Sequence, residues 1–290
     1  MKKILLPVDF TEFSDNAIAY ALTLIGKMGG ELRLIHAFYD PFLFGDEEEI
    51  SENLRKSANP ELFNQRNTAS ESLKALEEKV HTTIREQHLE NVLCSSVFAE
   101  GYVEDEILRE AARFQPQIIL MGAHGHNRLD RMFFGSVTQG VFRHAYWPVM
   151  ALPHKYAYQQ VKEVVYLTDF NENDIYTIGK IINLFAPFQM KLHITHFNMD
   201  NHKDHDDAAM RALEDAIRKD YVDQKVECEL IDARILDQAY EEYFKNNKID
   251  LVALTTRKMP AFKRLFTHSS ATELLYHGEI PLLVFHANEK

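Results

Sequence analysis

The chain repeats one pattern of strands and helices twice, and this duplication constrains its fold more than any other feature. Residues 3–10 form an apolar run that ends in Asp9-Phe10, and residues 163–170 form a second run that ends in Asp169-Phe170. Strand-like apolar runs then alternate with helix-like segments in both halves. Near-continuous apolar strands between helices are typical of a parallel sheet covered on both faces. The sequence therefore predicts an α/β protein with two tandem, doubly wound, five-stranded parallel sheets.

The expected elements follow the same order in both halves. The first helix of the first half ends before Gly29-Gly30, and its counterpart ends before Pro187. We expect further strands at 32–38, 92–98, 118–121, 148–153, 191–197, 226–231, 251–254 and 281–285, and further helices near 60–88, 103–114, 136–144, 205–222 and 235–246. The predicted domains are residues 1–155 and 161–290, with a linker near 153–160.

A glycine spacing in the first half indicates a site for an anion. Two residues separate Gly122 from Gly125, nine separate Gly125 from Gly135, and Ser136 follows. The motif lies between an apolar strand and a helix start. Glycine lets the backbone approach an anion, and free amides at the helix start point towards it. Because ligands of such sheets bind beyond the carboxyl ends of the strands, we expect Asp9 and Ala37 to lie nearby.

The second copy of this motif, residues 254–269, has lost its glycines. Thr255, Lys258 and His268 stand in their places, and their Cβ atoms would crowd the backbone approach. We therefore expect a degenerate nucleotide site in the second half. The charge of Lys258 leaves open a different small anionic ligand there.

These residues resemble the universal stress protein family in its tandem two-domain form. The specific part of the resemblance is the ATP-binding signature of the family's nucleotide-binding branch, which Gly122, Gly125, Gly135 and Ser136 match in spacing. The resemblance implies a Rossmann-like fold of the adenine nucleotide alpha hydrolase type and an ATP ligand. By this resemblance, the residues near the adenine and ribose are Pro7, Asp9, Ala37, Met121 and Gly122. The residues near the phosphates are Gly125, His126, Gly135, Ser136 and Val137. For Asp9 a helix-capping role with Thr11 and Ser14 is the alternative.

Composition excludes several classes of function. The net charge of −12 disfavours general nucleic-acid binding, which needs a basic face. No apolar stretch reaches the roughly 18 residues of a membrane span, and the apolar N-terminus is too short for a signal segment, so we expect a cytoplasmic protein. Cys94 and Cys228 are interpreted as small core residues in a reducing compartment.

No catalytic residue and no metal ligand set is predicted. The glycine motif lacks the Lys-Ser or Lys-Thr of a Walker A loop, and no committed base accompanies it. His193 and His196, three apart on one strand, point to opposite faces and cannot share a metal. The sequence thus favours nucleotide binding in stress response or signalling over turnover. The alternatives are a slow ATPase whose Mg²⁺ is held mainly by the phosphates, and a module that binds another ligand in its second domain.

The last strand of each half suggests how the halves pair. Residues 149–152 and 282–285 are apolar at nearly every position, more than one buried face requires. An open edge of this kind needs a covering strand. The resemblance to the universal stress protein family implies that such domains pair about a two-fold axis through their last strands. We therefore expect these two strands to pair antiparallel about a pseudo-two-fold axis, with a homodimer and an unidentified protein partner left open. We interpret the acidic insertion near 39–59 as a solvated loop. The alternative is a lid or a partner-binding arm.

Overall fold

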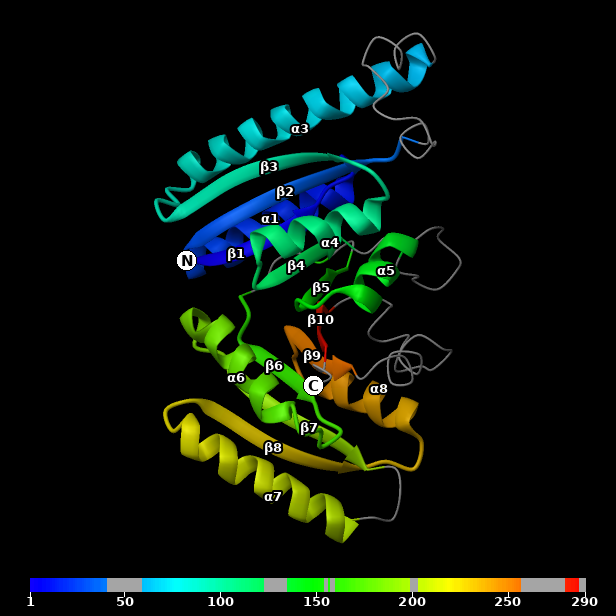
Figure 1. Cartoon of the computed structure of the whole chain (residues 1–290). Coiled ribbons are helices and arrows are strands. Elements are labelled where there is room, and N and C mark those ends of the chain that lie inside the picture. The colour runs from blue at the N-terminus through cyan, green and yellow to red at the C-terminus, as the bar shows by residue number, and fades with distance from the viewer. Residues whose placement is uncertain are drawn as a thin grey trace. The chain divides into compact units, whose positions relative to one another are not determined.

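The computed structural model describes residues 1–40, 59–122, 135–153, 156, 160–198, 203–256 and 280–286 (Figure 1). The chain divides into two compact units. Unit 1 comprises Met1–Met121 and Ser136–His144, and unit 2 holds the remaining described residues. Within the described residues, no helix is long and apolar enough to cross a membrane.

Unit 1 is a parallel sheet with helices packed on it. Its elements are β1 (Lys2–Pro7), α1 (Glu12–Met28), β2 (Gly30–Phe38), α3 (Pro60–Glu86), β3 (Val92–Glu100), α4 (Val103–Phe114), β4 (Ile118–Gly122) and α5 (Ser136–His144). The strand order is β3-β2-β1-β4, and each strand runs parallel to its neighbours in this series. Helix α1 packs on β1 and β2, α3 packs on β2 and β3, and α4 packs on all three of these strands.

The local sequence explains the ends of these elements. Ile118, Ile119 and Leu120 of β4 are all buried, as expected for a strand covered on both faces. Helix α1 ends at Gly29, whose φ of 67° lies in the left-handed region that favours glycine. A side chain on the next residue, Gly30, would collide with the carbonyl oxygen of Lys2, so the turn into β2 requires both glycines.

Unit 2 repeats this architecture and has two more strands among its described residues. Its elements are β5 (Val149–Leu152), β6 (Glu163–Leu167), α6 (Asp174–Phe185), the 3₁₀ turn η2 (Ala186–Phe188), β7 (Lys191–Asn198), α7 (Lys203–Asp220), β8 (Lys225–Asp232), α8 (Leu236–Asn246), β9 (Leu251–Thr256) and β10 (Leu282–His286). The strand order is β5-β10-β9-β6-β7-β8. Strand β5 runs antiparallel to β10 with Met150 opposite Leu283, which confirms the predicted pairing of the two last strands.

The fold class is the one expected from the duplicated pattern, with element ends shifted by a few residues. Strand β3, for example, continues to Glu100 rather than ending near 98. Strand β5 ends the first sequence repeat but belongs to the second compact unit. The domain limits 1–155 and 161–290 therefore remain a prediction about the repeats. The insertion at 41–58 lies outside the described residues, as does most of the segment that follows β9.

Candidate functional site

Five of the predicted ligand residues lie at the carboxyl edge of the first repeat's sheet. Pro7 is the last residue of β1, and Asp9 follows it by two positions. Ala37 is the penultimate residue of β2, and Met121 and Gly122 end β4. Because β1 pairs in parallel with both β2 and β4, these three strand ends meet at one edge. This edge is where ligands of doubly wound sheets bind.

The Asp9 carboxylate is fixed by the start of α1. Its Oδ1 atom accepts hydrogen bonds from the Thr11 backbone N–H at 3.2 Å, the Thr11 hydroxyl at 2.5 Å and the Ser14 hydroxyl at 2.7 Å. The Asp9 N–H also donates to the Ser14 oxygen at 2.9 Å. The bond from the Thr11 N–H to Asp9 forms an Asx turn that leads into α1, and it involves the Thr11 and Ser14 named with the alternative role of Asp9. The N-cap residue is Thr11, which makes no side-chain capping bond. Asp9 remains exposed, so the turn orients the carboxylate without covering it.

An aromatic pair that the sequence analysis did not single out shapes the same turn. Phe10 has a φ of 61°, and its ring lies 4.4 Å from the His36 ring, centroid to centroid. The His36 Nδ1–H donates to the Val8 carbonyl at 2.8 Å. The second repeat has the same arrangement, with Phe170 at a φ of 54° and its ring 4.4 Å from that of His196. The Asp-Phe step shared by both halves was the signal for this turn.

A second aromatic pair borders the edge. Tyr39 follows β2, Tyr102 precedes α4, and both are exposed with ring centroids 5.2 Å apart. A hydrogen bond to Tyr102 raises the pKa of Tyr39. The Gly101 N–H donates to the Phe38 carbonyl at 3.0 Å, which holds the two connections together. No single stretch of sequence signals this pair, because its members lie on different elements.

The phosphate side of the predicted site is described only in part. Gly135 is exposed directly before α5, and Ser136 and Val137 form the first turn of that helix. Among the described residues, a Cβ built on Gly135 meets no atom within 4 Å. The remaining predicted phosphate contacts, Gly125 and His126, lie outside the described residues. The described residues around Gly135 therefore leave room for a side chain.

The matched position of Ala37 in the second repeat holds a large aromatic residue. Leu6 pairs with Leu34 in the first repeat and Tyr166 pairs with Ile194 in the second, so the same register places Phe197 where Ala37 stands. Phe197 is buried. Its ring lies 4.3 Å from that of Tyr240 and 5.6 Å from that of Tyr243.

The matched position of Gly122 is also filled. The pairing of β6 with β9 places Thr255 there. The Thr255 hydroxyl lies 2.9 Å from that of Tyr166 and 3.1 Å from that of Thr177. Tyr166 is fully buried and donates to Asp174 Oδ1 at 2.7 Å. Burial raises the pKa of both Tyr166 and Asp174. Lys258 and His268, the other two replacements, lie outside the described residues.

Comparison with known proteins agrees with this architecture. The model of the universal stress protein family matches residues 1–153, which is more than half of the chain. Universal stress protein MJ0577 of Methanocaldococcus jannaschii is 27% identical over 167 residues, which cover 53% of this chain and 96% of that protein. Universal stress protein A homolog 1 of Coxiella burnetii is 26% identical over 152 residues, which cover 52% of this chain and 95% of that protein.

The fold of the whole chain has solved counterparts. The crystal structure of a universal stress protein from Archaeoglobus fulgidus aligns with a TM-score of 0.73 at 17% identity, over 99% of this chain and 98% of that one. This likeness extends over both repeats, whereas the family model matches the first. Together with the fold described above, these matches show that the chain belongs to the universal stress protein family.

Proposed function

We propose that the first repeat binds one ATP and that the chain acts as a cytoplasmic stress-response or signalling protein. The glycine signature supports this proposal, since its spacing matches that of the family's nucleotide-binding branch. In the proposed site, Pro7, Asp9 and Ala37 contact the adenine and ribose. The signature glycines and the start of α5 hold the phosphates.

One observation carries the assignment to the first repeat alone. At two register-matched positions the first repeat has Ala37 and Gly122, and the second has Phe197 and Thr255. The second pair fills the corresponding space with an aromatic cluster and a buried hydrogen-bonded network. Placing a nucleotide there would require both to be dismantled. We therefore propose a stoichiometry of one nucleotide per chain.

The chemistry of the proposed site suits binding rather than turnover. The carboxylate of Asp9 accepts hydrogen bonds from a ribose hydroxyl or the adenine amine, and Ser136 offers a hydroxyl at the helix start. Backbone amides at that start favour the phosphate charge in spite of the acidic chain. We assign no residue as a catalytic base. Any Mg²⁺ that accompanies ATP is held mainly by its phosphates.

The test is a calorimetric titration of the full chain with Mg-ATP, comparing the natural protein with Gly135→Val. No described residue lies within 4 Å of a Cβ at this position, so we expect the variant to fold while phosphate approach is blocked. We expect affinity to fall about 100-fold or more, equivalent to ~2.7 kcal/mol. The matched control is Tyr146→Val at a residue that is 82% exposed, and it leaves affinity unchanged.

Two outcomes contradict the proposal. The first is a folded Gly135→Val protein that binds ATP as the natural chain does. The second is two equivalent nucleotides per chain, which would show that Phe197 and Thr255 do not close the second site. If the natural chain instead releases phosphate from ATP faster than the uncatalysed rate, and Gly135→Val does not, the protein is a slow ATPase.

A further inference from the structure

We propose that the second repeat binds a divalent transition-metal ion of the Zn²⁺ class, with His193 of β7 and Glu227 and Glu229 of β8 as ligands. Both strands belong to unit 2, and His193 lies near the amino end of β7. The site therefore does not depend on the proposed nucleotide site, whose residues follow the carboxyl ends of strands. From the sequence, His193 was considered only as a partner of His196, so this set of three ligands was not predicted.

The strand register brings the three side chains together. His193 lies opposite Glu227 in the parallel pair, and Glu229, two residues further on, faces the same side. His193 Nδ1 lies 3.4 Å from Glu229 Oε1 and 3.7 Å from Glu227 Oε2. One ligand atom of each residue lies within 4.8 Å of the others. Tetrahedral Zn²⁺ with bonds of about 2.0–2.1 Å separates its ligand atoms by roughly 3.3–3.5 Å. Small rotations of the two glutamates close the remaining gap.

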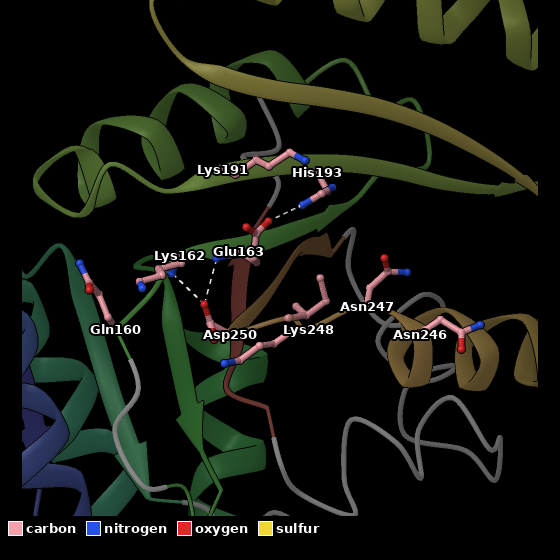
Figure 2. A pocket seen from close by; sticks show the side chains of 10 residues that line it. Gln160, Lys162, Glu163, Lys191, His193, Asn246, Asn247, Lys248 and Asp250 are labelled. Carbon is pink, nitrogen blue, oxygen red and sulfur yellow. Dashed lines mark hydrogen bonds and ion pairs between the residues drawn. The ribbon is translucent and has the colours of Figure 1, made fainter.

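A third carboxylate lies where it can orient the imidazole for a metal. His193 Nε2 lies 2.7 Å from Glu163 Oε2, and Figure 2 marks this contact with a dashed line. When the Nε2–H is donated to Glu163, the Nδ1 lone pair faces the two other carboxylates and is available to a metal. Metal-binding histidines commonly donate their second ring N–H to a carboxylate in this way. The ring itself is only 9% exposed, so its position is fixed by the surrounding strands.

In the first repeat, the position equivalent to His193 carries a positively charged side chain. The same register position holds Arg33, whose guanidinium pairs with Glu31 at 2.7 Å and Glu110 at 2.9 Å. Arginine supplies a permanent positive charge there. In the second repeat three carboxylates contact the imidazole, and the ammonium of Lys191 pairs with Glu227 Oε1 at 2.6 Å. Three carboxylates against one permanent positive charge make this group acidic, which favours a divalent cation.

The surroundings provide both access and support. The Glu227 side chain is 53% exposed, so an ion reaches the ligands from solvent. On the other side of the imidazole, Glu163, His193 and Lys191 line a cavity of about 540 Å³ (Figure 2). The Tyr243 hydroxyl is hydrogen-bonded to Glu229 and orients that carboxylate. One imidazole with two carboxylates suits Zn²⁺ better than Mg²⁺ or Ca²⁺, which prefer oxygen ligands alone.

The experiment titrates the chelator-treated full chain with Zn²⁺ alone, without nucleotide, by calorimetry. A parallel titration with Co²⁺ records the visible absorption bands of a tetrahedral site. The decisive variant is His193→Arg, which places at this position the residue type that the first repeat has there, beside the same carboxylates of Glu163, Glu227 and Glu229. We expect at least a 100-fold loss of Zn²⁺ affinity and loss of the Co²⁺ bands. Glu163→Gln, which disturbs only the orienting hydrogen bond, should weaken binding by about 10–100-fold.

The matched control is His205→Gln, at an exposed histidine beside Asp206 in the same unit. It should bind Zn²⁺ as the natural chain does. The proposal is overturned if the natural chain gives neither saturable Zn²⁺ binding nor Co²⁺ bands. It is also overturned if His193→Arg, folded by circular dichroism, keeps the affinity and stoichiometry of the natural chain.

Discussion

The antiparallel pairing of β5 and β10 makes a quantitative prediction about Met150. Met150 and its partner Leu283 are fully buried, and the flanking residues of both strands are buried as well. Met150→Asp removes an apolar side chain whose burial contributes about 1.5–3 kcal/mol. It also places a carboxyl group where no water solvates it. We expect unit 2 to lose much of its stability or to unfold.

The ionisation of the introduced carboxyl group determines the second part of the loss of stability. Burial raises its folded-state pKa above the unfolded value of about 3.9. If that pKa reaches 7 or more, ionisation contributes about 4 kcal/mol at pH 7, at 1.36 kcal/mol per unit. As pH rises, the unfolded chain releases the carboxyl proton before the folded chain does. The loss of unfolding free energy is therefore smallest near pH 4, and it grows until the pH passes the folded-state pKa of the carboxyl group. The total at pH 7 is about 6 kcal/mol, comparable to the stability of a whole domain.

The assay is urea unfolding at pH 5 and pH 8, followed by circular dichroism. Met150→Leu, which conserves volume, should cost less than about 1.5 kcal/mol at both pH values. Tyr146→Asp, at a residue 82% exposed, should stay within about 0.5 kcal/mol of the natural protein. A Met150→Asp protein as stable as the natural chain, or a deficit that does not grow with pH, would refute the burial of this strand pair.

Two further predictions follow from buried polar groups. Tyr166→Phe should destabilise the chain by about 1–3 kcal/mol in urea unfolding, because the buried Asp174 carboxyl loses a hydrogen-bond donor. An unchanged urea midpoint would contradict this prediction. Burial raises the pKa of Cys94 to about 12, so at pH 8 iodoacetamide should modify it about a hundredfold or more slowly than in the urea-unfolded chain. Equal rates would show a thiol that is open to solvent.

The sequence predicts the strands well because their apolar runs are set by burial on both faces. Ile118, Ile119 and Leu120 are apolar without alternation, and they form a strand buried throughout. The pairing of β5 with β10 followed from the apolar character of both strands together with the resemblance to universal stress proteins. The C-terminal end of α1 followed from glycines with a specific backbone requirement. The apolar runs and the glycine pair are local signals, so the sequence alone contains them.

The features that the sequence analysis missed depend on contacts between distant elements. Tyr39 and Tyr102 are 63 positions apart and meet only because β2 and β3 align. The bond between Tyr166 and Thr255 depends in the same way on the pairing of β6 with β9. Periodicity indicates which face of a strand is buried, but it does not give the register between strands. Polar clusters built across a register therefore emerged only from the structure.

The two repeats show that one backbone scaffold supports opposite chemistry at equivalent positions. Both keep the left-handed phenylalanine after the first strand and the histidine that bonds the preceding turn, so the turn geometry is common to them. That geometry does not require Gly122 rather than Thr255, since each fits its own repeat. Nor does the sheet require Arg33 rather than His193. Because the sheet and its turns suffice to form the fold, the residues at both ends of the strands are free to differ. Any ligand that a repeat binds is therefore determined by those residues and not by the fold.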